Sequence, residues 1–146
     1  MAHIVLFHSI LGLRPAERAI AAAFEADGHT VDLPDLYGGR TAEDYDAGFA
    51  LKREIGDAVI EERARAALAR APRRSVFSGI SFGAFLIGRV WDELPDSAGA
   101  LLFSGTVPWM EPRRKGFPIQ AHIAEPDPFD PEEVFEDWVE HAGGVS

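Results

Sequence analysis

The chain has 146 residues, 47% of them hydrophobic, which suits a single globular domain with a buried core. Its formal net charge of -10 argues against a nucleic-acid partner and against an anionic membrane surface, since both attract basic proteins. The absence of cysteine excludes disulfides and a thiol nucleophile. No apolar run approaches the ~20 residues of a membrane-spanning helix, so we expect a cytoplasmic protein without membrane contacts.

Apolar runs alternate with helical patterns through the first half of the chain. A continuous apolar run over 4–7 predicts a buried first strand, and Pro15 opens a helix. A short strand is expected at 30–33, a polar loop at 34–46 and a helix over about 57–71. The apolar stripe of the first helix is predicted to consist of Ala16, Ile20, Ala23 and Phe24.

The alternation continues in the second half. Strands are expected at 75–78, 100–103 and 118–124, and an apolar helix at about 82–93. A last helix begins after Asp130, which is its predicted N-cap. Strands that alternate with helices form a parallel sheet covered on both faces. The sequence therefore predicts one α/β domain over 1–146, a three-layer sandwich whose doubly wound, mostly parallel sheet has the strand order 2-1-3-4-5.

The sharpest motif follows the third predicted strand and reads Gly79-Ile80-Ser81-Phe82-Gly83. This G-x-S-x-G pattern between a strand and a helix is typical of a nucleophile elbow, whose strained turn exposes the serine hydroxyl. Small residues are needed two positions before and after the serine because the turn is tight. We interpret Ser81 as a catalytic nucleophile, and a chance match of the pattern is the alternative.

An acylated serine also needs donors for the oxyanion. The N–H of Phe82, directly after the nucleophile, is one predicted donor. The second is expected from the loop after the first strand, and we assign it to the N–H of Ile10. The alternative is that this loop is a simple turn between a strand and a helix.

A third element follows the fifth predicted strand, in the segment Ala124-Glu125-Pro126-Asp127-Pro128-Phe129. Hydrolases of this kind carry serine, acid and histidine in that order along the chain. Asp127 is therefore predicted to be the acid that orients a catalytic histidine. An acidic turn made rigid by its two prolines is the alternative.

Together these segments resemble the dienelactone hydrolase family. The resemblance rests on LFHSILGLRP, PDLYGGRT, SGISFG and IQAHIAEPDPFDP. It implies an α/β-hydrolase fold, a Ser-His-Asp triad with Ser81 and Asp127, and hydrolysis of small-molecule esters or lactones without metal or cofactor. It also implies that Tyr37 and Arg40 belong to a loop that helps to bind an anionic substrate. Founding members carry cysteine in place of Ser81, so a general carboxylesterase is as consistent as a dienelactone hydrolase.

The catalytic histidine is the missing element. In the family it follows one more strand, and this chain stops where that strand would begin, so we expect a C-terminally incomplete domain. His141 is too far along the last helix to reach Ser81, at ~1.5 Å of rise per residue. His8 follows the first strand and is a candidate for a substitute base or a substrate contact. His3, His29 and His122 are expected to be structural.

Three explanations of the missing histidine remain open. The chain is a fragment of an active hydrolase, or another chain supplies the last strand and histidine, or the protein is an inactive binding module of the same fold. An uncovered sheet edge favours a homodimer. The loop 105–116, which contains Trp109, is a lid, a substrate wall or a plain solvated loop.

Overall fold

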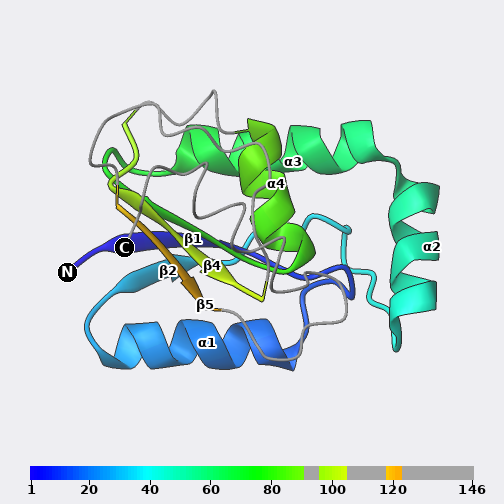
Figure 1. The fold of residues 1–146 in the computed structure, drawn as a ribbon, viewed down its shortest axis with the longest axis horizontal. Helices are drawn as coiled ribbons and strands as arrows, with labels where there is room; N and C mark the ends of the chain where they lie inside the picture. Colours follow the sequence, from blue (N-terminus) through cyan, green and yellow to red (C-terminus); the bar gives the residue numbers. More distant parts are fainter. Residues whose placement is uncertain (91–95, 105–117, 123–146) are drawn as a thin grey trace.

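The computed structural model describes residues 1–90, 96–104 and 118–122. Its centre is a five-stranded sheet in which every pair of neighbouring strands is parallel. The strand order is β2-β1-β3-β4-β5, which confirms the predicted order 2-1-3-4-5 (Figure 1). The strands are β1 (His3–Phe7), β2 (Thr30–Asp32), β3 (Val76–Ile80), β4 (Gly99–Phe103) and β5 (Ile119–His122).

Helices cover both faces of this sheet, as the doubly wound prediction requires. In Figure 1, α1 (Pro15–Ala26) lies below the sheet, and α3 (Asp57–Arg70) and α4 (Phe82–Val90) lie above it. The helix α2 (Tyr45–Ile55) lies beyond the end of the sheet toward which β1 runs. The described part of the chain is thus a three-layer α/β sandwich, with α2 placed beside the carboxyl ends of the strands.

The sheet centre explains the unbroken apolar run of β1. Four of its five residues are buried, and Val5, Leu6 and Phe7 have no exposed surface. A strand between β2 and β3 with helices on both faces has no solvated side, so every position favours an apolar residue. The core that forms around it also includes Leu36, Ile60, Leu86 and Leu102.

The buried stripe of α1 differs from the predicted one. The buried residues are Glu17 and Ala21, whereas Ala16 and Ala23 are exposed. The prediction counted only apolar residues, but the inward face begins with an acid. The Glu17 carboxylate is buried because it accepts hydrogen bonds from the N–H groups of Ser9 and Arg14, at 3.2 and 3.1 Å.

The helix α2 was not predicted. Only Gly48 and Leu51 of its eleven residues are buried, and its large apolar residues Tyr45 and Phe49 are exposed, so its apolar positions do not mark one buried face. Its end signals are present, however. The Asp44 side chain caps it by accepting the Ala47 N–H at 2.8 Å, and Gly56 ends it at φ 95°.

Candidate active site

Ser81 occupies the turn between β3 and α4, at the position that the elbow motif predicts. Its φ is 53°, in the left-handed region that residues with a side chain rarely adopt. Its N–H donates to Phe103 O of β4 at 2.8 Å, and its carbonyl oxygen accepts the Phe85 N–H of α4 at 3.2 Å. A strained conformation of this kind costs about 1–3 kcal/mol and persists only where the surroundings impose it, often at functional sites.

The two glycines of the motif are sterically required. A Cβ on Gly79 would lie 2.2 Å from the carbonyl carbon of Gly83. A Cβ on Gly83 would lie 2.3 Å from Phe7 O and 2.8 Å from His8 O. The first turn of α4 therefore touches the backbone of both β3 and β1, and any side chain at either position would push these elements apart.

The two predicted oxyanion donors leave neighbouring strands at the same edge of the sheet. Phe7 of β1 is paired with Gly79 of β3, so Ile10 and Phe82 each follow this pair by three residues. Phe82 is the first residue of α4, where N–H groups have no acceptor within the helix. Ile10 is 3% exposed, and within the described residues no acceptor is found for its N–H. Neither N–H thus has a partner that would conflict with the predicted role, and both remain predicted oxyanion donors.

His8 is fully buried, and both of its ring nitrogens are engaged. Nδ1 lies 2.8 Å from Ser9 O, and Nε2 accepts the Leu36 N–H at 3.0 Å. Burial lowers its pKa, against smaller opposing effects of the Ser9 carbonyl and of the Asp35 and Glu17 charges. This arrangement disfavours the prediction that His8 is a substitute base or a substrate contact, because the ring is buried and both nitrogens already have partners.

Tyr37 also points inward. It is 1% exposed, its hydroxyl donates to Ile10 O at 2.9 Å, and burial raises its pKa to about 12. It therefore holds the loop after β1 in place, an arrangement that disfavours the expected substrate contact. Arg40 is exposed and pairs with Glu54 of α2 at 3.0 Å, so its predicted contact with an anionic substrate remains a prediction.

The other predicted histidines have local partners. Nδ1 of His3 lies 2.8 Å from Thr30 Oγ1, and His29 Nδ1 accepts the Ala2 N–H at 3.0 Å. His122, at the end of β5, lies 2.8 Å from the Gln120 amide nitrogen and stacks on Phe103. Across the described ranges no side-chain group suits a metal ion. Asp127, Trp109 and His141 lie outside the described residues.

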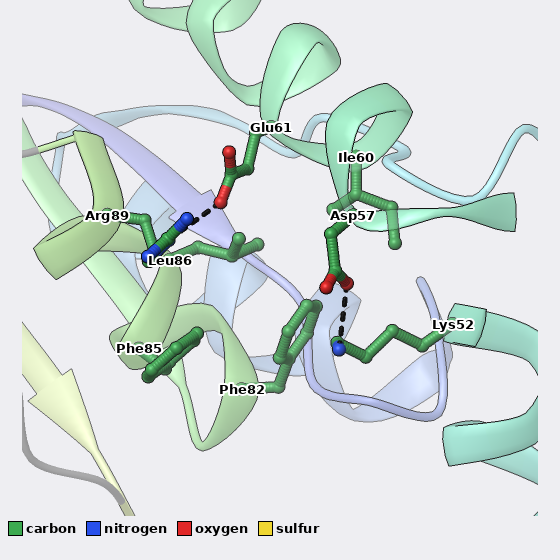
Figure 2. A pocket seen from close by; sticks show the side chains of 8 residues that line it. All are labelled: Lys52, Asp57, Ile60, Glu61, Phe82, Phe85, Leu86 and Arg89. Carbon is green, nitrogen blue, oxygen red and sulfur yellow. Dashed lines mark hydrogen bonds and ion pairs between the residues drawn. The ribbon is translucent and has the colours of Figure 1, made fainter.

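A hollow of about 190 Å³ lies beside the first turn of α4 (Figure 2). Figure 2 shows the rings of Phe82 and Phe85 below residues of α3, with Lys52 of α2 closing one side. Lys52 pairs with Asp57 at 2.7 Å, and the other charged residues of the hollow form a second pair, also at 2.7 Å. Its complete lining is Lys52, Asp57, Ile60, Glu61, Phe82, Phe85, Leu86 and Arg89.

Comparison with protein families agrees with this geometry. The family model described as "Dienelactone hydrolase family" matches residues 1–142. The chain belongs to the dienelactone hydrolase family. This assignment covers the elbow, both predicted donor loops and the segment that contains Asp127. No curated protein sequence matches the chain significantly.

Solved structures share the fold of this dienelactone hydrolase family member. A dienelactone hydrolase-like promiscuous phosphotriesterase from metagenomic libraries superposes with a TM-score of 0.74 and 16% identity, over 100% of this chain and 68% of that one. A putative α/β-superfamily hydrolase from Xanthomonas campestris pv. campestris gives a TM-score of 0.64 at 24% identity, over 99% and 84%. The two likenesses show a shared fold.

The pyrethroid hydrolase PytH is a much longer protein that this chain matches only in part. It gives a TM-score of 0.53 at 27% identity over 71% of this chain, which spans only 40% of the PytH chain. Within the described residues, no helix of this family member is both long and apolar enough to cross a bilayer.

The sequence did not identify the hydrogen bonds that hold the loop after β1. They come from His8, Glu17 and Tyr37, all three of which are buried. Two of these residues were assigned to the substrate side and the third to no role. A signal for Glu17 was present, because an acid three residues after an N-cap can accept the N-cap N–H, as Glu17 does from Arg14.

Proposed function

We propose that this family member is a serine hydrolase that cleaves esters or lactones by acyl transfer through Ser81. The observation that carries the proposal is the conformation of Ser81, at φ 53° between β3 and α4. A serine held in this strained turn is the arrangement that α/β hydrolases use to expose a nucleophile.

The reaction would run in two steps. Ser81 Oγ attacks the carbonyl carbon and loses its proton to a base, while the C–O bond to the leaving alkoxide breaks and the alkoxide takes up that proton. Water then cleaves the acyl–serine ester and restores the hydroxyl. The N–H groups of Phe82 and Ile10 stabilise the oxyanion formed in both steps. Asp127 would orient a histidine base, which none of the described histidines provides.

The substrate class follows from the family and from the lining of the hollow. Dienelactone hydrolases and the similar PytH are named for lactone and pyrethroid hydrolysis. Beside Phe82, the exposed ring of Phe85 offers an apolar surface for a substrate side group. We therefore favour small, partly apolar carboxylic esters or lactones.

Covalent labelling of Ser81 is the direct test. The full chain is incubated with a fluorophosphonate probe, and mass spectrometry locates the adduct. The matched control is Ser104→Ala, because Ser104 has a φ of 51° and directly follows the neighbouring strand β4. We expect wild type and Ser104→Ala to be labelled at Ser81, and Ser81→Ala to remain unlabelled and to lose turnover of an activated ester.

An inactive binding module is the second candidate. It is favoured by one observation, that no histidine among the described residues hydrogen-bonds the Ser81 hydroxyl. An unlabelled wild-type protein, with ester turnover equal to that of Ser81→Ala, would favour this candidate over the hydrolase.

A further inference from the structure

The peptide group that joins Ser9 to Ile10 is held by a side chain. Its carbonyl oxygen, Ser9 O, lies 2.8 Å from His8 Nδ1 and accepts the Gly12 N–H at 3.1 Å. In a planar trans peptide the C=O and the N–H point in opposite directions. Fixing the carbonyl therefore fixes the direction of the Ile10 N–H, which points away from His8 and has no acceptor among the described residues.

The proton on His8 can be assigned from the neighbouring loop. The Leu36 N–H can only donate, so Nε2, which lies 3.0 Å from it, must be unprotonated. Nδ1 then carries the proton and donates to Ser9 O. The ring is fully buried and meets Tyr37 edge-on with ring centroids 4.8 Å apart, and a turned ring would lose both hydrogen bonds unless its proton also moved. The loop after β2 thereby sets the tautomer that orients the loop after β1.

Two further contacts hold the flanking peptide groups. The Tyr37 hydroxyl donates to Ile10 O at 2.9 Å, and Glu17 Oε1 accepts the Ser9 N–H at 3.2 Å. Three successive peptide groups of this loop are thus tied to buried side chains, one from the loop itself, one from α1 and one from the loop after β2. Among them, only the His8 contact acts on the peptide that contains the Ile10 N–H.

We propose that His8 is a positioning residue for catalysis, whose Nδ1–H keeps the Ser9–Ile10 peptide oriented so that the Ile10 N–H faces the oxyanion. The inference rests on the proposed function of Ser81. If this peptide turned over, Ser9 O would face the oxyanion in place of the N–H, and repulsion would replace a hydrogen bond. His8 touches no reacting atom and acts only through this peptide group.

Two substitutions of His8 separate its donor from its bulk. His8→Phe keeps a ring but removes both nitrogens, whereas His8→Asn can keep an N–H donor near the place of Nδ1. We expect His8→Phe to lower the maximal rate of fluorophosphonate labelling of Ser81 about 10²–10³-fold, as for loss of one oxyanion donor, with an unchanged half-saturating probe concentration. His8→Asn should be labelled at least about tenfold faster than His8→Phe.

The control is His29→Phe, which removes a half-buried histidine at the other edge of the sheet and should leave the labelling rate unchanged. Equal maximal rates for wild type and folded His8→Phe would overturn the inference while leaving the proposed function intact. An unlabelled wild type would instead overturn the proposed function.

Nuclear magnetic resonance tests the arrangement without relying on reactivity. In wild type, ¹⁵N spectra should show His8 with a protonated Nδ1 and an unprotonated Nε2 at neutral pH. In His8→Phe, the Ile10 amide signal should broaden or double as the peptide samples two orientations. A proton on Nε2 in wild type, or a single sharp, unshifted Ile10 signal in folded His8→Phe, would refute the role of His8.

Discussion

Replacing Gly83 by alanine tests whether the first turn of α4 is as closely packed on the sheet as its geometry indicates. The new Cβ would lie 2.3 Å from Phe7 O, and the two must separate to at least 3.0 Å. Both contacting groups are backbone, so no rotamer change can relieve the overlap. We expect a loss near the upper end of the overpacking range, about 3 kcal/mol. For a domain of this size, that loss lowers the melting temperature by about 6–12 °C.

The matched control is Gly28→Ala, at a glycine with a positive φ but open space around its Cβ position. Gly28 has a φ of 91° but no atom within 4 Å of its Cβ position, so alanine there costs only backbone strain, about 1–2 kcal/mol. Urea denaturation and thermal melts, both followed by circular dichroism, compare the two variants. A Gly83→Ala protein that is no less stable than Gly28→Ala would refute the close packing of α4 on β1 and the steric reason for glycine in the motif.

Three more outcomes are expected. Ser81→Gly should be about 1–2 kcal/mol more stable than Ser81→Ala in urea denaturation, because glycine adopts a φ of 53° without strain; equal stabilities would contradict a strained elbow. Tyr37→Phe should lose about 1–3 kcal/mol, since it leaves Ile10 O buried without its partner, and an unchanged urea midpoint would argue against that hydrogen bond. Burial lowers the pKa of His8, so as the pH falls His8 takes up a proton in the unfolded chain before it does in the folded protein. The contribution of neutral His8 to the free energy of unfolding should therefore be fully present above pH 6.5 and decrease as the pH falls below it. In His8→Asn, the free energy of unfolding should decrease less steeply over the same pH range.

Much of the fold could be predicted because each of its periodic patterns is compatible with only one type of secondary structure. Apolar runs without alternation require strands covered on both faces, and this gave the five parallel strands in the observed order. The exception is α2, which packs through the buried Leu51 and through the close approach of Gly48 to Ile10 O in the loop after β1. A contact made by a missing side chain leaves no hydrophobic signal in the sequence.

The candidate site was predictable only where a motif fixes the backbone. The position and strained turn of Ser81 followed from the spacing of Gly79 and Gly83. The inward direction of His8 and Tyr37 did not, because both lie in loops, where no period relates position to burial. A polar residue near the end of a strand can face a substrate or the neighbouring loop, and only the tertiary contacts distinguish the two.

Because β1 pairs with β3, one edge of β1 stays unpaired during synthesis until residues 76–80 have left the ribosome. At typical bacterial and eukaryotic rates of elongation, the interval after β1 is made lasts about 4–15 s. Helix α1 and strand β2 can assemble against β1 early, but the nascent chain still presents an apolar strand edge that favours aggregation. Conditions that slow translation between these two strands should therefore lower the yield of native protein.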